Sequence, residues 1–168
     1  MRIEIVEIES PIGGIVVACN GPAVVALHFG DSRAEFESDL RRRFREWDPV
    51  AGPHAGGAAN RLRAYFAGDI PILEGLDVDP AGTPFQQSVW AQLRAIPAGR
   101  TVSYREIAAA IGAPAATRAV GAANGANPIG IIIPCHRVIG SNGTLTGYGG
   151  GLDRKRWLLA HEGVMLAT

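Results

Sequence analysis

Three residues with reactive side chains stand next to one another in this chain: Cys135, His136 and Arg137. They follow Pro134 and the apolar run 131–133, which predicts a strand-like segment ahead of the cysteine. A thiol attacks as its thiolate, and with a pKa of about 8.5 it is only slightly ionised at neutral pH unless a base or a positive charge lies beside it. His136 and Arg137 are candidates for that role, so the pattern predicts nucleophilic chemistry at sulfur. The alternative is that Cys135 is a small buried hydrophobe, as unpaired cysteines often are.

Glycines are dense in the segment that follows the cysteine. Residues 140–143 read as a turn, and residues 147–151 form a glycine-rich stretch with one aromatic side chain, Tyr148. Glycine lets the backbone approach a ligand closely and adopt positive φ without steric cost. The segment is therefore a candidate wall of a site built around Cys135.

Taken together, these motifs resemble those of the O6-alkylguanine-DNA alkyltransferases, the methylated-DNA-protein-cysteine methyltransferases. The resemblance covers residues 83 to 163, and four motifs carry it in order: Asn127-Pro128, Pro134 to Val138, Gly147 to Gly151, and Leu158 to Gly163. It implies DNA repair by direct reversal, in which a methyl or alkyl group moves irreversibly and stoichiometrically from O6 of guanine to a cysteine of the protein. Whether O4 of thymine is also a substrate stays open.

The resemblance also implies a role for each catalytic residue. Cys135 accepts the alkyl group, His136 takes the thiol proton through a water, and Glu162 orients the imidazole. Tyr104 displaces the 3′ phosphate and donates a proton to the departing base. Asn127 ties the active-site turn to a helix-turn-helix.

Because O6 lies inside the duplex, the damaged nucleotide must rotate into a pocket, and Arg118 is expected to enter the vacated stack. The residues expected to contact DNA are Thr117, Arg118, Ala119, Gly121 and Tyr104. The residues expected to line the substrate pocket are Pro134, Val138, Tyr148, Gly149 and Gly150.

The sequence patterns of the elements that must position these residues predict an α+β protein with two domains, residues 1–80 and 81–168. The length and the 47% hydrophobic content suffice for a buried core. In the first domain, β-rich runs separated by tight turns predict an antiparallel sheet, and apolar residues at helical spacing predict helices. The expected strands are 2–8, 14–19 and 23–29, the expected helices 34–47 and 58–66, the loop 49–57 and the linker 76–82.

The second domain is expected to be mostly helical. Capping signals at Thr83 and Ser103, and a proline at position 114, predict helices that run to about residues 96, 111 and 124. The last two read as a helix-turn-helix. The small side chains of the last helix suit close, sequence-independent contact with the minor groove, although an alanine-rich helix packed in a core would look the same.

Charge is unevenly divided although the net charge is zero. Residues 1–80 carry 8 basic and 13 acidic side chains, whereas residues 81–168 carry 8 basic and 3 acidic ones. A basic half that holds the reactive cysteine favours a polyanionic partner. Charge segregation of this size could also arise by chance or serve domain docking. The arginines of residues 41–45 are expected to form a solvated helix face.

No cofactor or metal is expected. The four histidines and two cysteines show no paired metal-ligand spacing, and Cys19 and Cys135 are expected to be reduced. No apolar run reaches the roughly 18 residues of a membrane span, and acidic residues interrupt the N-terminal segment 1–7, so a cytoplasmic protein without a membrane partner is expected. The expected partner is double-stranded DNA bearing O6-alkylguanine, bound through the minor groove by a monomer.

Two other functions compete with alkyl transfer. One is a noncatalytic alkyltransferase-like protein that binds damaged DNA, but such proteins lack the reactive cysteine, which is present here. The other is a cysteine hydrolase that uses Cys135, His136 and Glu162. Repeated turnover of an acyl or ester substrate would distinguish it, and the sequence offers no evident oxyanion hole beyond glycine-rich backbone.

Overall fold

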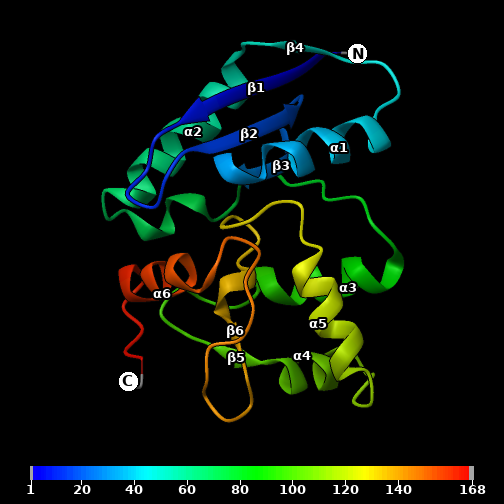
Figure 1. Cartoon of the computed structure of the whole chain (residues 1–168), viewed down its shortest axis with the longest axis vertical. Helices are drawn as coiled ribbons and strands as arrows, with labels where there is room; N and C mark the ends of the chain where they lie inside the picture. The colour runs from blue at the N-terminus through cyan, green and yellow to red at the C-terminus, as the bar shows by residue number, and fades with distance from the viewer. Residues whose placement is uncertain (1, 167–168) are drawn as a thin grey trace. The chain divides into compact units, whose positions relative to one another are not determined.

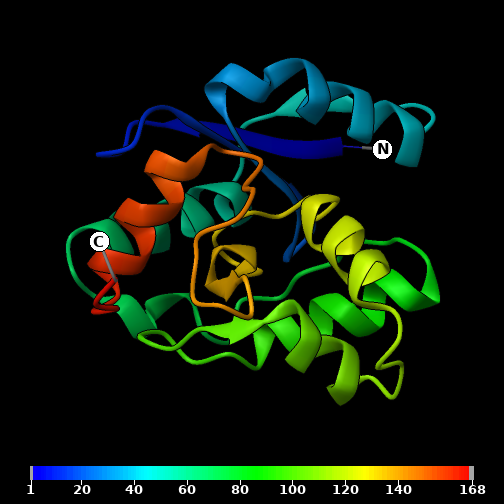
Figure 2. The ribbon, with the colours of Figure 1, turned by 60° about the horizontal axis from the view of Figure 1, so that its bottom comes forward.

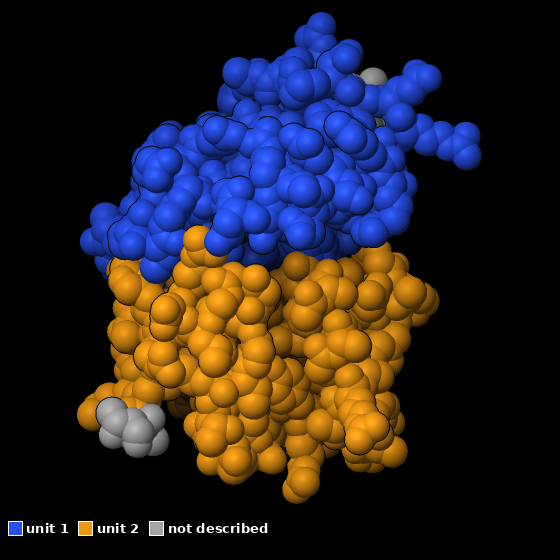
Figure 3. Space-filling view, viewed as in Figure 1, with its two compact units in different colours: residues 1–80, 128–132 blue, residues 81–127, 133–168 orange. Residues whose placement is uncertain are grey.

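The computed structural model describes residues 2–166 and separates into two compact units (Figure 3). Unit 1 comprises residues 1–80 and 128–132, and unit 2 comprises residues 81–127 and 133–168. Unit 1 holds a four-stranded sheet with two α-helices, and unit 2 is mostly helical (Figure 1). The expected α+β class, with the sheet in the N-terminal part and a helix-turn-helix in the C-terminal part, is confirmed.

The sheet of unit 1 is built on the three strands that the sequence predicted. Strands β1 (Arg2–Ile8), β2 (Ile15–Asn20) and β3 (Ala23–Phe29) are antiparallel neighbours joined by tight turns. A fourth strand, β4 (Asp48–Val50), pairs in parallel with β1, so the order is β3-β2-β1-β4 and the sheet is mixed rather than purely antiparallel. The prediction of a loop over residues 49–57 is thus wrong for its first two residues. These residues carry no local strand signal, and they adopt an extended conformation because they pair with β1.

Two helices, α1 (Arg33–Arg43) and α2 (Pro53–Phe66), lie against opposite faces of this sheet (Figure 1). Side chains alternate between the faces of a strand. Accordingly Ile3 packs in the buried cluster with Phe36 and Leu40 of α1, whereas its neighbour Glu4 reaches the first residues of α2. A short 3₁₀ turn, η1 (Gly30–Ser32), precedes α1, and another, η2 (Ile70–Leu73), follows α2.

Helix α2 begins five residues earlier than the sequence indicated, at Pro53 instead of residue 58. Its N-cap, Gly52, has no side chain to bond the free amides of the first turn. The carboxylate of Glu4 in β1 does so instead, accepting from the amides of His54 at 2.9 Å and Ala55 at 3.3 Å. Because this cap comes from a distant strand, local sequence could not reveal it.

Helix α1 ends at Arg43, four residues short of the predicted end, because Phe44 is extended with φ −125° and ψ 113°. Trp47 is only half-buried and packs on the cluster from outside the helix. The arginine run is not a uniformly solvated face. The guanidinium of Arg43 is 10% exposed, pairs with Asp39 at 3.0 Å and donates to the carbonyl of Val25 at 2.6 Å.

The outer edge of β3 is covered by two segments from elsewhere in the chain. The amide of Val24 donates to the carbonyl of Asp77 at 2.9 Å, within the segment expected to be a linker. The amide of Leu27 donates to the carbonyl of Pro128 at 2.9 Å, and Leu27 forms a parallel bridge with Ile129. Residues 128–132 are therefore part of unit 1 although they lie far along the sequence.

Unit 2 is a group of short helices around a small two-stranded sheet (Figure 2). Helix α3 (Pro84–Arg94) has the predicted capping box between Thr83 and Gln86. It is held to α5 by a buried hydrogen bond of 2.8 Å from the indole of Trp90 to the carbonyl of Ala123. The remaining elements are β5 (Val102–Ser103), α4 (Tyr104–Ala110), α5 (Thr117–Gly125), η3 (Cys135–Arg137), β6 (Val138–Ile139) and α6 (Leu152–His161).

Helices α4 and α5 form the predicted helix-turn-helix, but α5 begins at Thr117 and not at Pro114. Pro114 instead occupies the second position of a turn that the amide of Ala116 closes on the carbonyl of Ala113 at 2.8 Å. Proline favours that position because its φ is already fixed near −65°.

The apolar run 131–133 is buried, as expected, but it is not a strand. Ile131 has φ 68°, and the amides of Ile132 and Cys135 each donate to the carbonyl two residues earlier, at 2.8 Å. Two tight turns therefore lead into the cysteine. Positive φ is rare for a β-branched residue, and a short apolar run marks burial without fixing the backbone conformation.

Candidate active site

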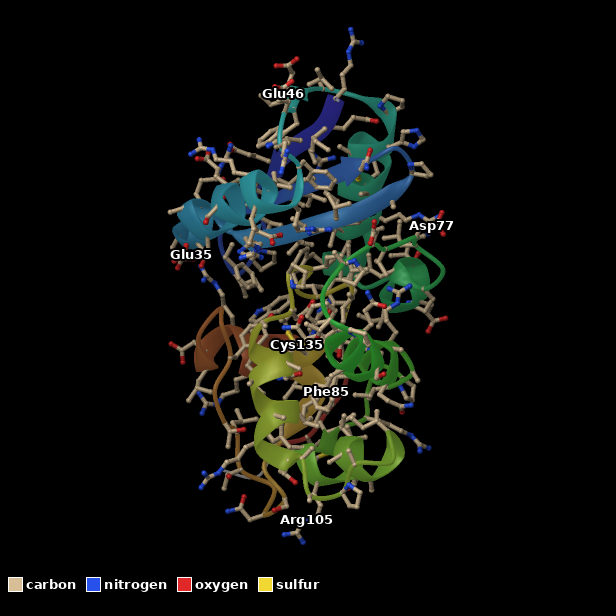
Figure 4. The ribbon with its side chains drawn as sticks, turned by 90° about the vertical axis from the view of Figure 1, so that its right-hand side faces the viewer. Glu35, Glu46, Asp77, Phe85, Arg105 and Cys135 are labelled. Carbon is tan, nitrogen blue, oxygen red and sulfur yellow. The ribbon has the colours of Figure 1, made fainter. Side chains whose placement is uncertain are left out.

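Cys135 is the first residue of η3 and lies next to the C-terminal end of α5, where Figure 4 labels it. Its backbone carbonyl accepts from the side-chain amide of Asn124 at 3.4 Å, and Asn127 donates to the carbonyl of Ile133 at 2.8 Å. The side chain of Asn127 also hydrogen-bonds the thiol of Cys135. Asn124 in α5 and Asn127 just after it thus hold the turn that presents the sulfur, and the hinge role expected for Asn127 stays a prediction.

His136 is fully buried and bound to Glu162, the C-cap residue of α6. Its Nε2 lies 2.9 and 3.0 Å from the two carboxylate oxygens. An Nε2 proton donated to the carboxylate leaves the lone pair on Nδ1, and this Nδ1 is buried without a hydrogen-bond partner among residues 2–166. The imidazole is therefore oriented to accept a proton at Nδ1.

Arg137 contacts the carboxylate and not the thiol. Its Nε and Nη2 donate to the two oxygens of Glu162 at 2.8 and 2.9 Å, and its Nη1 donates to the carbonyl of Ile96 at 2.7 Å. The hypothesis that Arg137 activates Cys135 directly is wrong, because the planar guanidinium finds a bidentate carboxylate partner in Glu162. Arg137 fixes Glu162, and Glu162 fixes His136.

The pKa values of this group follow from burial and from these bonds. Burial lowers the pKa of His136, against the opposing effect of Glu162, so the imidazole is neutral in the resting protein. Burial alone would raise the pKa of Glu162, but hydrogen bonds from Arg137 and His136 bring it far below its usual range. A neutral imidazole held by an ionised carboxylate is the form that can accept a proton.

The thiol itself is held in its protonated form. Burial raises the pKa of Cys135, while the hydrogen bond from Asn127 and the positive charge of Lys155 act in the opposite direction. The cysteine is 7% exposed. A reaction at this sulfur therefore requires a base, and the adjacent residue in the chain, His136, has its Nδ1 free to accept a proton.

Lys155 in α6 is a functional candidate that the sequence reasoning missed. It is fully buried, and its ammonium donates to the carbonyl of Val138 at 2.6 Å and to the carbonyl of Thr146 at 2.8 Å. Burial lowers its pKa to about 8, and the charge of the Cys135 thiolate opposes that shift. The signal was available: Lys155 precedes the buried Leu158 and Leu159 by three and four residues, which places it on the inner face of the helix.

Tyr104 is the first residue of α4 and is half-buried. Its hydroxyl oxygen accepts a hydrogen bond from the hydroxyl of Thr146 at 3.0 Å. A side-chain carbon added at Gly121 of α5 would lie 3.9 Å from the Tyr104 ring, an ordinary van der Waals contact, so Gly121 faces the tyrosine across the helix-turn-helix.

The outer face of the helix-turn-helix carries exposed residues of small size and positive charge. Arg118 and Ala119 of α5 are exposed, and Thr117 and Gly121 are half-buried. Arg105 of α4 extends away from the ribbon into solvent (Figure 4). This face has the composition expected for contact with a phosphate backbone.

The five residues expected to line the pocket divide into two groups. Pro134 and Val138 flank η3 and are buried, and the carbonyl of Val138 is bound by Lys155. Tyr148, Gly149 and Gly150 lie in the segment between β6 and α6, where Tyr148 is half-buried and Gly149 is exposed. Their place in a substrate pocket stays a prediction.

Within residues 2–166, no group of three or more histidine, cysteine, aspartate or glutamate side chains is placed to hold a metal ion. Within the same residues, no helix has the length and apolar character to cross a bilayer.

Comparison with known proteins gives consistent matches along the chain. The family description "6-O-methylguanine DNA methyltransferase, DNA binding domain" matches residues 84–164. A methylated-DNA-protein-cysteine methyltransferase of Salmonella typhimurium is 47% identical over 163 residues, 95% of each chain. One of Mycobacterium bovis is 49% identical over 155 residues, 92% of this chain and 89% of the relative. The crystal structure of Mycobacterium tuberculosis OGT in complex with DNA superposes with a TM-score of 0.81 at 47% identity, covering 96% of this chain and 92% of the other.

Proposed function

Since this chain belongs to the methylated-DNA-protein-cysteine methyltransferase family, we propose that Cys135 is the residue that accepts the alkyl group. The chain binds DNA and repairs O6-methylguanine in it by moving the methyl group to a cysteine of its own. The observation that supports Cys135 is the bond between His136 Nε2 and the Glu162 carboxylate at 2.9 Å, which leaves Nδ1 able to accept the thiol proton.

The proposed reaction is an in-line displacement at carbon. The Sγ lone pair of Cys135 forms a bond to the alkyl carbon while the bond from that carbon to O6 breaks, and the bond electrons stay on guanine. The thiol proton goes to His136, and Tyr104 supplies a proton to the departing base. The thioether formed at Cys135 is stable to hydrolysis, and the proposed reaction includes no second nucleophile that would regenerate the thiol, so each molecule acts once. No cofactor is needed, because the damaged DNA itself is the alkyl donor.

The finer features of DNA binding are also proposed. Arg118, Ala119, Thr117 and Gly121 give α5 a small, positively charged outer surface that suits close approach to the minor groove of a duplex. Arg118 would fill the stack left by the rotated nucleotide, as the family resemblance implies. Activity on O4-alkylthymine stays open.

We further propose that a monomer is sufficient, because Cys135, His136, Glu162, Tyr104 and Asn127 all come from unit 2 of one chain. We also propose a cytoplasmic location, with the protein in the same compartment as the DNA that it repairs.

Intact mass measurement after incubation with an O6-methylguanine oligonucleotide tests the acceptor. We expect the mass to rise by one CH2 unit, once per molecule, with the modification on the peptide that contains Cys135. Cys19 is an internal control, because burial and the charge of Glu4 raise its pKa to about 11. Modification of Cys19, or recovery of unmodified protein with repaired DNA, would contradict the proposal.

A Cys135→Ala variant separates transfer from binding. It should bind the same oligonucleotide and leave the lesion in place. A wild-type protein that binds without any gain in mass would instead support the noncatalytic damage-binding function, and repeated hydrolysis of an ester would support a hydrolase.

A further inference from the structure

Thr146 lies at the junction of two functional side chains in unit 2. Its hydroxyl donates to the Tyr104 hydroxyl at 3.0 Å, and its backbone carbonyl accepts from the Lys155 ammonium at 2.8 Å. One residue of the segment between β6 and α6 is thus bonded both to the aromatic residue of the helix-turn-helix and to the buried cation whose charge acts on Cys135.

The surrounding backbone holds both partners of Thr146 in place. Strands β5 and β6 pair in parallel, with Val102 opposite Val138 and Ser103 opposite Ile139. Tyr104 follows β5 directly, and the carbonyl of Val138 in β6 is the second acceptor of the Lys155 ammonium at 2.6 Å. The segment that carries Cys135 and the segment that carries Tyr104 are therefore linked by the pairing of β5 with β6. The Thr146 side chain adds a second link, from the segment after β6 to Tyr104.

The direction of the hydroxyl bond matters for chemistry. A phenol has one proton to donate and lone pairs to accept with. When Thr146 is the donor in this 3.0 Å contact, the phenol proton stays available for another acceptor. A hydroxyl that accepts one hydrogen bond is polarised and becomes a better donor in the next.

We propose that Thr146 is a positioning residue for the transfer reaction: its hydroxyl holds the Tyr104 oxygen so that the phenol proton faces the DNA. The proposal rests on the role of Tyr104 in the proposed function. It assigns to Thr146 no contact with the reacting atoms.

Thr146→Val tests the proposal, because valine keeps the branched shape and the backbone carbonyl that Lys155 needs but removes the hydroxyl. We expect single-turnover methyl transfer from duplex DNA to slow by roughly three- to tenfold, the effect of one lost neutral hydrogen bond. Thr146→Ser restores a hydroxyl and should recover most of the rate. Thr144→Val is the matched control, because Thr144 lies in the same segment and its hydroxyl bonds Asn142 at 2.6 Å instead of Tyr104.

Two further measurements separate positioning from a general structural effect. The rate at which iodoacetamide alkylates Cys135 should be the same in Thr146→Val and wild type, because the thiol, His136 and Lys155 are untouched. In a Tyr104→Phe background, Thr146→Val should cause no additional slowing, because the acceptor oxygen is gone.

Absence of methyl transfer by the wild type would overturn the proposed function. Normal transfer by the wild type together with an unslowed Thr146→Val, an unrecovered Thr146→Ser, or an additional loss in the Tyr104→Phe background would overturn the role of Thr146 alone.

Discussion

Lys155 places an ammonium group inside unit 2, where its hydrogen-bond partners among residues 2–166 are backbone carbonyls and not acidic side chains. Two carbonyl oxygens solvate it, and its positive charge favours ionisation of Cys135. Burying a cation costs free energy unless hydrogen bonds and an opposite charge compensate. A thiolate that forms at Cys135 supplies that charge, so the lysine and the attacking sulfur stabilise each other.

Replacement of Lys155 by methionine should therefore shift the ionisation of the thiol. The variant keeps the length of the side chain but removes a positive charge, and this loss raises the pKa of Cys135. We expect the midpoint of Cys135 alkylation by iodoacetamide, followed against pH, to move upward by about one pH unit or more. Methyl transfer near pH 7 should slow accordingly and recover partly in alkaline buffer. An unchanged midpoint would show that Lys155 only packs.

The residues of the site differed in how readily the sequence revealed them. Cys135, His136 and Glu162 were predicted because they stand in motifs with a family resemblance, and the bond between His136 and Glu162 supports that pairing. Arg137 was a candidate for activating Cys135 but binds Glu162, since adjacency to Cys135 in sequence does not decide where a long side chain reaches. Thr146 carries no local signal, because its importance depends on two bonds formed across the fold.

The start of α2 shows how one element of unit 1 depends on another. Glu4 of β1 accepts from two amides at the N-terminus of α2, and its negative charge also suits the positive end of the helix dipole. A side-chain carbon added at Gly52 would lie 2.0 Å from the Glu4 carboxylate, so the N-cap must stay without a side chain while this bond exists.

Glu4→Ala should lower the free energy of unfolding by about 0.5–2 kcal/mol, the range for loss of a helix cap. Glu7→Ala is the matched control on the same strand. Glu7 pairs with Arg33 on the surface, and its side chain is 69% exposed, so its loss should cost well under about 1 kcal/mol. Urea unfolding of both variants measures the difference. Equal losses would show that Glu4 does not cap α2.

The elements that the sequence predicted well are those encoded by local signals. The three antiparallel strands and the capping box of α3 are confirmed, because turn residues and cap spacing act within a few residues. The elements predicted poorly are those set by distant contacts. Strand β4 exists through pairing with β1, and the tight turns of residues 131–133 look like a strand from composition alone.

Across the whole molecule, the basic excess of residues 81–168 is not all available to DNA. Arg137 is bound to Glu162 and Lys155 is buried, so no more than six of the eight basic side chains can meet phosphates. The charge count from sequence overstated the binding surface, because it cannot distinguish an exposed cation from one used inside the fold.

Binding to a short duplex should therefore show moderate salt dependence. Each phosphate neutralised by the protein contributes about 0.9 to the slope of log K against log salt, so six contacts set a limit of about −5. Fluorescence anisotropy at several salt concentrations measures the slope. A slope of about −7 would require all eight cations and would contradict the internal roles of Arg137 and Lys155.

The sheet of unit 1 is completed by residues that the ribosome makes late. A ribosome that has released residues 1–80 has not yet supplied the backbone groups of Pro128 and Gly130 that bond Leu27 on the edge of β3. Until that later stretch emerges, the nascent sheet presents free amide and carbonyl groups to neighbouring polypeptides. The edge of β3 at Leu27 can therefore be paired only after residues 128–130 have been synthesised, so the sheet of unit 1 is completed late in translation.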